Sequence, residues 1–154
     1  MINVIVVVIA VLVALSISWV MKRRAPEPPT QGGFHVPTQL DRADFPQSST
    51  PWLIAVFTSA TCDACQDVVS KAVVMRSEQV SVVNIEYQTD KPVHERYAID
   101  AVPTLVVADR DGVVRAGFIG PIKAQDLWAA VAECREPGST PEPHLGRDQL
   151  DNNQ

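Results

Sequence analysis

A run of seven residues, WLIAVFT at positions 52–58, is apolar at every position except the last. Pro51 and Ser59 bound this run. A strand with one face in water alternates apolar and polar residues, whereas a short continuous apolar run is typical of a strand buried on both faces. Such a strand needs cover on both sides, so the run predicts a sheet that lies between two layers of helices.

Three further segments have strand-like patterns. They cover residues 80–86, 104–108 and 113–119, and the Asp111-Gly112 pair before the last of them is a typical hairpin turn. Residues 34–45, in front of the first strand, show no pattern that assigns them to a helix or a strand.

Helical patterns separate these strands. From Cys65 onward, apolar side chains recur at the spacing of an amphipathic helix, at Val68, Val69, Ala72 and Val73. A short helix is expected at 91–98, with Asp90 as its N-cap, and a last helix at 123–135. The order β-α-β-α-β-β-α predicts an α/β fold whose mixed central sheet is covered by helices on both faces.

The beginning of the chain has a different character. Residues Ile2–Met21 include only three polar side chains, and Lys22, Arg23 and Arg24 follow them. As a helix this segment would extend roughly 30 Å, the thickness of the hydrocarbon core of a bilayer. A cleaved signal peptide is the alternative, but the chain lacks a basic segment before the span and a small-residue cleavage site after it. Residues 1–24 therefore predict one retained transmembrane helix with a basic stop.

The charges beside this span predict its orientation. All of the nearby basic side chains follow the span, and only the α-amino group precedes it. Basic residues near a transmembrane helix favour the cytoplasmic side. We therefore expect a single-pass protein of the cell membrane whose remaining residues lie in the cytoplasm.

Composition divides the remainder into three parts. Residues 25–33 (APEPPTQGG) read as a Pro/Gly linker, residues 34–136 as one domain that we expect to be monomeric, and residues 137–154 as a disordered tail. The formal net charge is −5. A nucleic-acid-binding protein needs a basic surface to neutralise phosphates, so this charge argues against nucleic acid as a partner.

The chemistry-bearing motif is Cys62-Asp63-Ala64-Cys65, at the junction between the first strand and the first helix. A helix N-terminus carries unpaired N–H groups and partial positive charge, which stabilise a thiolate. Cys62 is expected to attack a substrate sulfur, and Cys65, one turn further along, to resolve the mixed disulfide. The carboxylate of Asp63 disfavours the Cys62 thiolate and would tune its pKa; alternatively, Asp63 only stabilises the first helical turn.

Other uses of the cysteine pair stay open. A structural zinc ion needs two more ligands, and the candidates Cys134, His35, His94 and His144 are scattered without a second paired spacing. The pair could also consist of inert buried thiols, or deliver copper. Cys134 itself is expected to be a passive, partly buried thiol, with a regulatory or intermolecular cysteine as the alternative.

Several segments resemble the thioredoxin family. They are FTSATCDAC at 57–65, VVNIE at 82–86, YAIDAVPTLVV at 97–107, the Asp111-Gly112 turn, and Gly120 before the last helix. The similarity covers residues 52–135, with the family's order of elements. It implies a thioredoxin-like fold and a thiol–disulfide oxidoreductase that acts on protein dithiols or disulfides, with no organic cofactor and no metal.

The resemblance also assigns a substrate-binding surface. It implies that the Val102-Pro103 peptide bond is cis and lies against the cysteine pair. Val102 would then offer its backbone to an extended substrate segment beside the sulfurs, as in a short added strand. Thr61, directly before Cys62, occupies a position that is usually aromatic in the family and is expected to contact substrate.

The sequence also departs from the family. The residues between the cysteines are Asp63-Ala64 where Gly-Pro is common. A buried acid that helps to move the proton of the second cysteine is replaced by Val56, and a lysine near that acid by Val82. These losses favour an alternative function, a redox-inactive or weakly active thioredoxin-like module that binds a membrane partner.

Overall fold

The computed structural model describes residues 34–141 and 144–151. The transmembrane segment predicted at Ile2–Met21 and the linker at 25–33 lie outside them. Within the described ranges, no helix combines the length and apolarity needed to cross a membrane.

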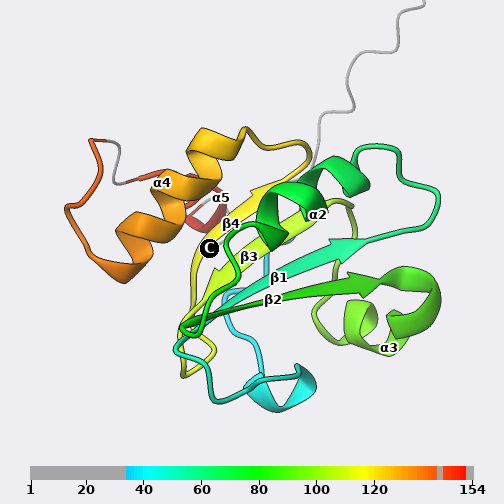
Figure 1. The fold of residues 1–154 in the computed structure, drawn as a ribbon. Helices are drawn as coiled ribbons and strands as arrows, with labels where there is room; N and C mark the ends of the chain where they lie inside the picture. The colour runs from blue at the N-terminus through cyan, green and yellow to red at the C-terminus, as the bar shows by residue number, and fades with distance from the viewer. Residues whose placement is uncertain (1–33, 142–143, 152–154) are drawn as a thin grey trace, which may run out of the picture. The chain divides into compact units, whose positions relative to one another are not determined.

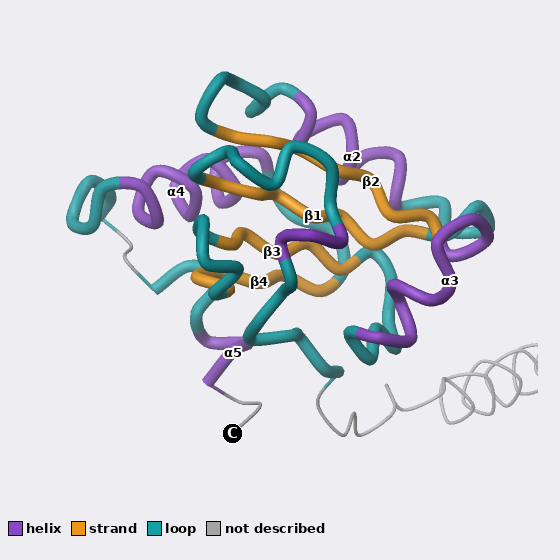
Figure 2. Tube along the Cα trace, turned by 90° about the horizontal axis from the view of Figure 1, so that it is seen from below, coloured by secondary structure: helices purple, strands orange, loops and turns teal. Residues whose placement is uncertain are grey.

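Four strands form one mixed sheet in the order β2-β1-β3-β4. Figure 2 shows the four strands side by side in this order. They are β1 (Trp52–Thr58), β2 (Val80–Glu86), β3 (Thr104–Ala108) and β4 (Val114–Ile119). β1 pairs in parallel with β2 and antiparallel with β3, and β3 pairs antiparallel with β4. The predicted mixed sheet is thus confirmed.

Helices cover both faces of this sheet (Figure 1). They are α2 (Cys65–Val73), α3 (Tyr87–Arg96) and α4 (Ala124–Arg135), with a 3₁₀ turn, η1 (Arg42–Asp44), and a short α5 (Asp148–Asp151). Ile54 and Val56 of β1 pack in the core with α2 and α4. Leu53 and Phe57 pack in the second core, with Tyr97 and the segment before η1. Successive side chains of β1 point alternately into the two cores, which explains why the run is apolar at consecutive positions.

One predicted helix begins earlier than its sequence pattern indicated. The expected helix at 91–98 is α3, which starts at Tyr87, directly after β2. Asp90, the expected N-cap, has non-helical backbone angles and marks a kink between two helical pieces. The first piece is short and mostly polar, so it gave no periodic signal. It begins at Tyr87 because β2 ends at Glu86.

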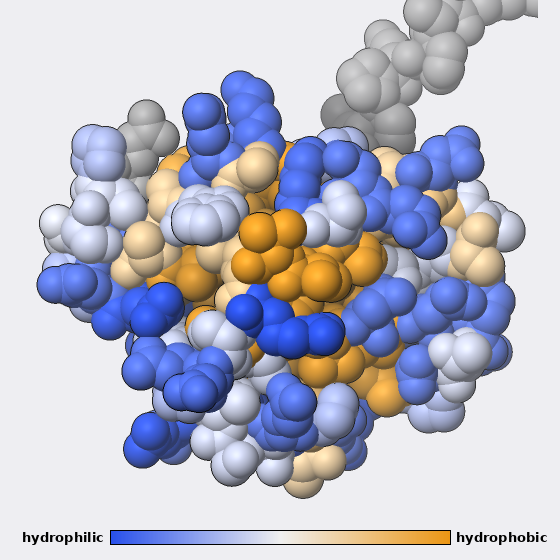
Figure 3. All heavy atoms as spheres, in the orientation of Figure 1, coloured by the Kyte–Doolittle hydropathy of each residue, from blue (hydrophilic) through white to orange (hydrophobic). Residues whose placement is uncertain are grey.

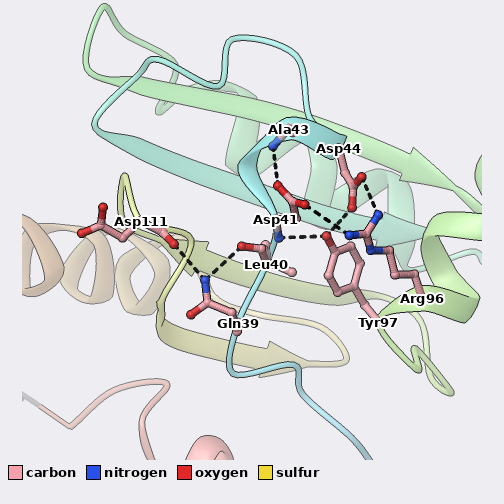
Figure 4. Close-up of polar contacts among 8 residues, drawn as sticks. All are labelled: Gln39, Leu40, Asp41, Ala43, Asp44, Arg96, Tyr97 and Asp111. Carbon is pink, nitrogen blue, oxygen red and sulfur yellow. Dashed lines mark hydrogen bonds and ion pairs between the residues drawn. The ribbon is translucent and has the colours of Figure 1, made fainter.

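The residues before β1, which had no readable pattern, are held by polar contacts (Figure 4). The hydroxyl of Tyr97 donates to Asp44 Oδ2 at 2.5 Å and accepts from the backbone N–H of Asp41 at 2.9 Å. Arg96 pairs with the carboxylates of both Asp41 and Asp44. Gln39 extends the attachment to the hairpin, because its Nε2 donates to the carbonyl of Asp111 at 2.8 Å.

This attachment predicts a loss of stability at high pH. Burial and, next, the hydrogen bond to Asp44 raise the pKa of Tyr97 from 10.0 to about 12. Since the folded protein holds this proton more tightly than the unfolded chain, the stabilisation is complete below pH 10 and is lost as the pH rises towards 12. In urea titrations at pH 8 and pH 11, Tyr97→Phe should be about 1 kcal/mol less stable than wild type at pH 8 and lose less on going to pH 11. Equal losses in both proteins would contradict the prediction.

Residues 144–151, part of the segment predicted as a disordered tail at 137–154, contact the domain. The N–H of Gly117, in edge strand β4, donates to the carbonyl of Gly146 at 2.8 Å. Leu145 packs against the core under α2 and α4, Leu150 packs against the other core, and α5 follows Arg147. Two isolated leucines make no periodic pattern, but β4 offers unpaired backbone groups that this segment satisfies.

Candidate functional site

Cys62 and Cys65 form a disulfide, with the two sulfurs 2.09 Å and the two Cα atoms 5.4 Å apart. Cys65 is the first residue of α2 and only 3% of it is exposed, while Cys62 lies in the preceding loop and is half-buried. The N-cap residue, Ala64, has no side chain that could satisfy the N–H groups of the first turn. The cysteine pair therefore lies at the positive end of α2, and Cys62 is the more exposed of its two residues.

The loop that carries Cys62 is fixed by a residue of α3 that sequence reasoning missed. Gln88 Oε1 accepts the N–H of Ala60, and Gln88 Nε2 donates to Ser59 Oγ, both at 3.0 Å. The carbonyl of Ser59 in turn accepts the N–H of Cys62 at 3.1 Å. Thr61 is exposed, and its hydroxyl lies 3.2 Å from Ser59 Oγ. Gln88 thus clamps the loop from the adjacent end of the sheet.

The Val102-Pro103 peptide bond is cis, as the resemblance implied. Phe57 of β1 pairs with Thr104 of β3, so the loop after β1 and the loop before β3 leave the sheet at the same end. Pro103 is buried, and its carbonyl accepts the N–H of Gly120 at 2.8 Å. A pocket lined by Ser59 of the first loop and by Ala101 and Val102 of the second joins the two.

The sequence that forms this site matches a known protein family. The family model described as Thioredoxin matches residues 40–133, more than half of the chain. The chain belongs to the thioredoxin family. The disulfide at the start of α2 and the cis-proline, in loops at one end of the sheet, are thus set in a thioredoxin domain.

Solved structures share the fold at low identity. A thioredoxin-fold protein from Helicobacter pylori is 12% identical, covers 73% of this chain and 96% of its own, and has a TM-score of 0.51. Mitochondrial thioredoxin 3 from Saccharomyces cerevisiae, in its oxidised form, is 17% identical over 56% of this chain and 81% of its own, with a TM-score of 0.47. A mutant thioredoxin from Halobacterium salinarum is 23% identical over 52% of this chain and 71% of its own, with a TM-score of 0.45. No curated protein matches the chain significantly.

A small pocket opens beside the disulfide on the side of α2. Both cysteines line it, together with residues from the ends of β1 and β2, among them Thr58, Asn84 and Glu86. The hydroxyl of Thr58 donates to Asn84 Oδ1 at 2.8 Å. Sequence reasoning did not select Asn84 or Glu86, although their position in VVNIE, at the end of a strand parallel to β1, offered a signal.

The two valines that depart from the family pattern lie in the core that packs against α2. Val56 is fully buried and Val82 is 7% exposed, and both belong to the same cluster of apolar side chains. Neither can exchange a proton with Cys65. The thioredoxin domain therefore lacks an ionisable pair at these two positions.

Asp63 and Cys134 differ in their relation to the site. Asp63 is exposed and, within the described parts of the chain, has no hydrogen bond or ion pair, so its predicted tuning role stays a prediction. Cys134, on α4, is half-buried, and burial is the main cause that raises its pKa from 9.0 to about 11. Its thiol stays protonated at neutral pH, which fits a passive cysteine.

Proposed function

We propose that this protein is a membrane-anchored thiol–disulfide oxidoreductase that acts on protein disulfides through Cys62 and Cys65. The observation that carries the proposal is the Cys62–Cys65 disulfide at the N-terminus of α2, in which Cys62 is the more exposed residue. Membership of the thioredoxin family supports the same chemistry. Val102, Pro103 and Thr61 are proposed to contact the substrate.

The reaction transfers two electrons from the reduced pair to a substrate disulfide. The Cys62 thiolate attacks one substrate sulfur, the substrate S–S bond breaks, and the other substrate sulfur leaves as a thiolate. Cys65 then attacks Cys62, so the Cys62–Cys65 bond forms and the second substrate sulfur leaves. The partner that reduces Cys62–Cys65 again is a dithiol, and the same steps run in reverse for an oxidising role.

Reduction of insulin by dithiothreitol tests this proposal. The wild-type chain should shorten the lag before insulin precipitates, and Cys62→Ser should give the lag of dithiothreitol alone. Cys134→Ser is the matched control, since its thiol lies on α4, outside the pocket beside the disulfide, and should leave the rate unchanged. Equal rates for wild type and Cys62→Ser would contradict the oxidoreductase proposal.

The membrane part of the proposal rests on the apolar segment Ile2–Met21 and the basic residues after it. The full-length chain should stay in the membrane pellet after washing at high salt and at alkaline pH, and a chain that begins at residue 25 should not. Release of the full-length chain would contradict the anchor.

A membrane-impermeant thiol reagent, applied to intact cells after reduction, tests the cytoplasmic orientation. Cys62 should be protected from the reagent until the cells are opened.

One observation favours the alternative of an interaction module. Val56 and Val82 leave the core beneath α2 without an acid or a base, which would slow turnover. In that case the domain would keep its fold and the loops beside Pro103 for binding a membrane partner, and Cys62→Ser would bind that partner as well as wild type does.

A further inference from the structure

Glu86 lies at the end of β2, on the face of the sheet that α2 covers. In the parallel pairing it stands opposite Thr58, the last residue of β1. Side chains alternate along a strand: Val82 packs in the core beneath α2, and Ile85 packs in the other core. Glu86 therefore shares the face of Val82, and it lines the pocket that also contains both cysteines.

The resolving step creates a need for a base at this place. Cys65 has to lose its proton before it attacks Cys62, and it is almost fully buried, which disfavours a thiolate. Val56 and Val82, in the core beneath α2, cannot accept a proton. Among the described residues that line the pocket, Glu86 is the only carboxylate.

The charged side chains of the surrounding helices, which the structure describes, form no ion pair with Glu86. On α2, Lys71 pairs with Asp67, and on α3, Lys91 pairs with Glu95. Within the described ranges, the side chain of Glu86 has no ion pair, so its carboxylate is available to bind a proton. Asp63, the acid between the two cysteines, is exposed and does not line this pocket.

We propose that Glu86 accepts the proton of Cys65 when Cys65 resolves the mixed disulfide, a role that rests on the proposed function. The pocket has a volume of about 60 Å³, enough for a few water molecules that can relay the proton. The thiol proton passes to the carboxylate, the Cys65 sulfur forms its bond to Cys62, and the bond from Cys62 to the substrate sulfur breaks. In the reverse direction the protonated Glu86 returns the proton to Cys65.

Reaction with 5,5′-dithiobis(2-nitrobenzoate) separates the two steps. The full-length chain, purified in mild detergent and carrying Cys134→Ser, is reduced and mixed with less than one equivalent of the reagent. Attack by Cys62 releases the first thionitrobenzoate, and attack by Cys65 on the resulting mixed disulfide releases the second. Stopped-flow absorbance records both phases between pH 6 and pH 9.

Glu86→Gln should slow the second phase at least about tenfold at pH 7, because a positioned base contributes about 10²–10⁴-fold to a proton-transfer step. The first phase should change less than about twofold, which also reports an intact fold. The deficit should shrink as the pH rises, since hydroxide then removes the proton. Glu86→Asp should restore part of the rate. Glu78→Gln, the same change in the loop before β2, should leave both phases unchanged.

Two results would overturn the inference, and they are distinguishable. If wild type releases both equivalents and Glu86→Gln has an unchanged second phase across the pH range, Glu86 is not the proton acceptor while the oxidoreductase proposal stands. If wild type releases one equivalent only, Cys65 does not resolve the mixed disulfide, and the proposed function fails together with the inference.

Discussion

A Cys65→Ser variant is expected to stay covalently joined to a disulfide substrate, whereas Cys62→Ser is expected to form no such adduct in the same time. The reason is the asymmetry of the pair: Cys62 is half-buried in a loop at the positive end of α2, and Cys65 is 3% exposed. Without Cys65, nothing displaces the substrate sulfur from Cys62.

Oxidised glutathione and intact-mass spectrometry provide the measurement. Reduced Cys65→Ser should gain one glutathione on nearly every molecule, on Cys62. Cys134 serves as an internal control: with its pKa raised to about 11, roughly one molecule in ten thousand carries its thiolate at pH 7. Faster modification of Cys62→Ser than of Cys65→Ser would reverse the assignment of the attacking and resolving cysteines.

Gly112→Ala is expected to be the most destabilising of the substitutions considered. Gly112 has φ +78°, and a Cβ there would lie 1.9 Å from the backbone carbonyl oxygen of Leu40. The N–H of Leu40 also donates to the carbonyl of Gly112 at 2.8 Å, so the two backbones cannot separate without breaking this bond. Strain of about 1–2 kcal/mol from the backbone angle and the lost contact should together remove about 3–4 kcal/mol of unfolding free energy.

Gly138→Ala is the matched control for this prediction. Gly138 has φ +85°, but a Cβ there would meet no atom within 4 Å. It should therefore lose only the conformational part, about 1 kcal/mol, in the same urea titration. Equal losses at the two positions would show that the segment before β1 does not pack against the hairpin as described.

The space-filling view in Figure 3 shows apolar side chains gathered near the middle of the face that α2 and α4 cover, with polar side chains around them.

The core strands were predictable because their sequence signals are local. The bounds predicted for three strands, 52–58, 80–86 and 104–108, agree with β1, β2 and β3. β1 and β3 are apolar runs ended by polar or turn residues, and their burial on both faces leaves little freedom in their assignment. β2 interrupts its apolar residues with Ser81 and Asn84 but is rich in valine, which favours strands. The position of the motif Cys62-Asp63-Ala64-Cys65 was equally predictable, because the sequence pattern changes from strand to helix at this point.

The residues around the cysteines were less predictable, because their neighbours come from distant parts of the chain. Gln88 contacts the Cys62 loop only because α3 begins directly after β2. Glu86 reaches the pocket only because β2 pairs in parallel with β1, so that both strands end at the same edge. Gln88 carries no periodic or spacing signal of its own, and the only signal for Glu86 is its place at the end of the VVNIE strand.

The resemblance to the thioredoxin family implied the fold of that family and the place of the cis-proline. By itself the sequence determined the order of strands and helices and the position of the cysteine pair at a helix start. These depend on hydrophobic period, on breaker residues and on one short motif, all of which act over a few neighbouring residues. The tertiary structure alone decided the attachment of the segment before β1 through Tyr97, the packing of Leu145 and Leu150 beside β4, and the meeting of Glu86 with the cysteines. Those contacts join residues far apart in the chain, and their free energy exists only once the sheet has brought the partners together.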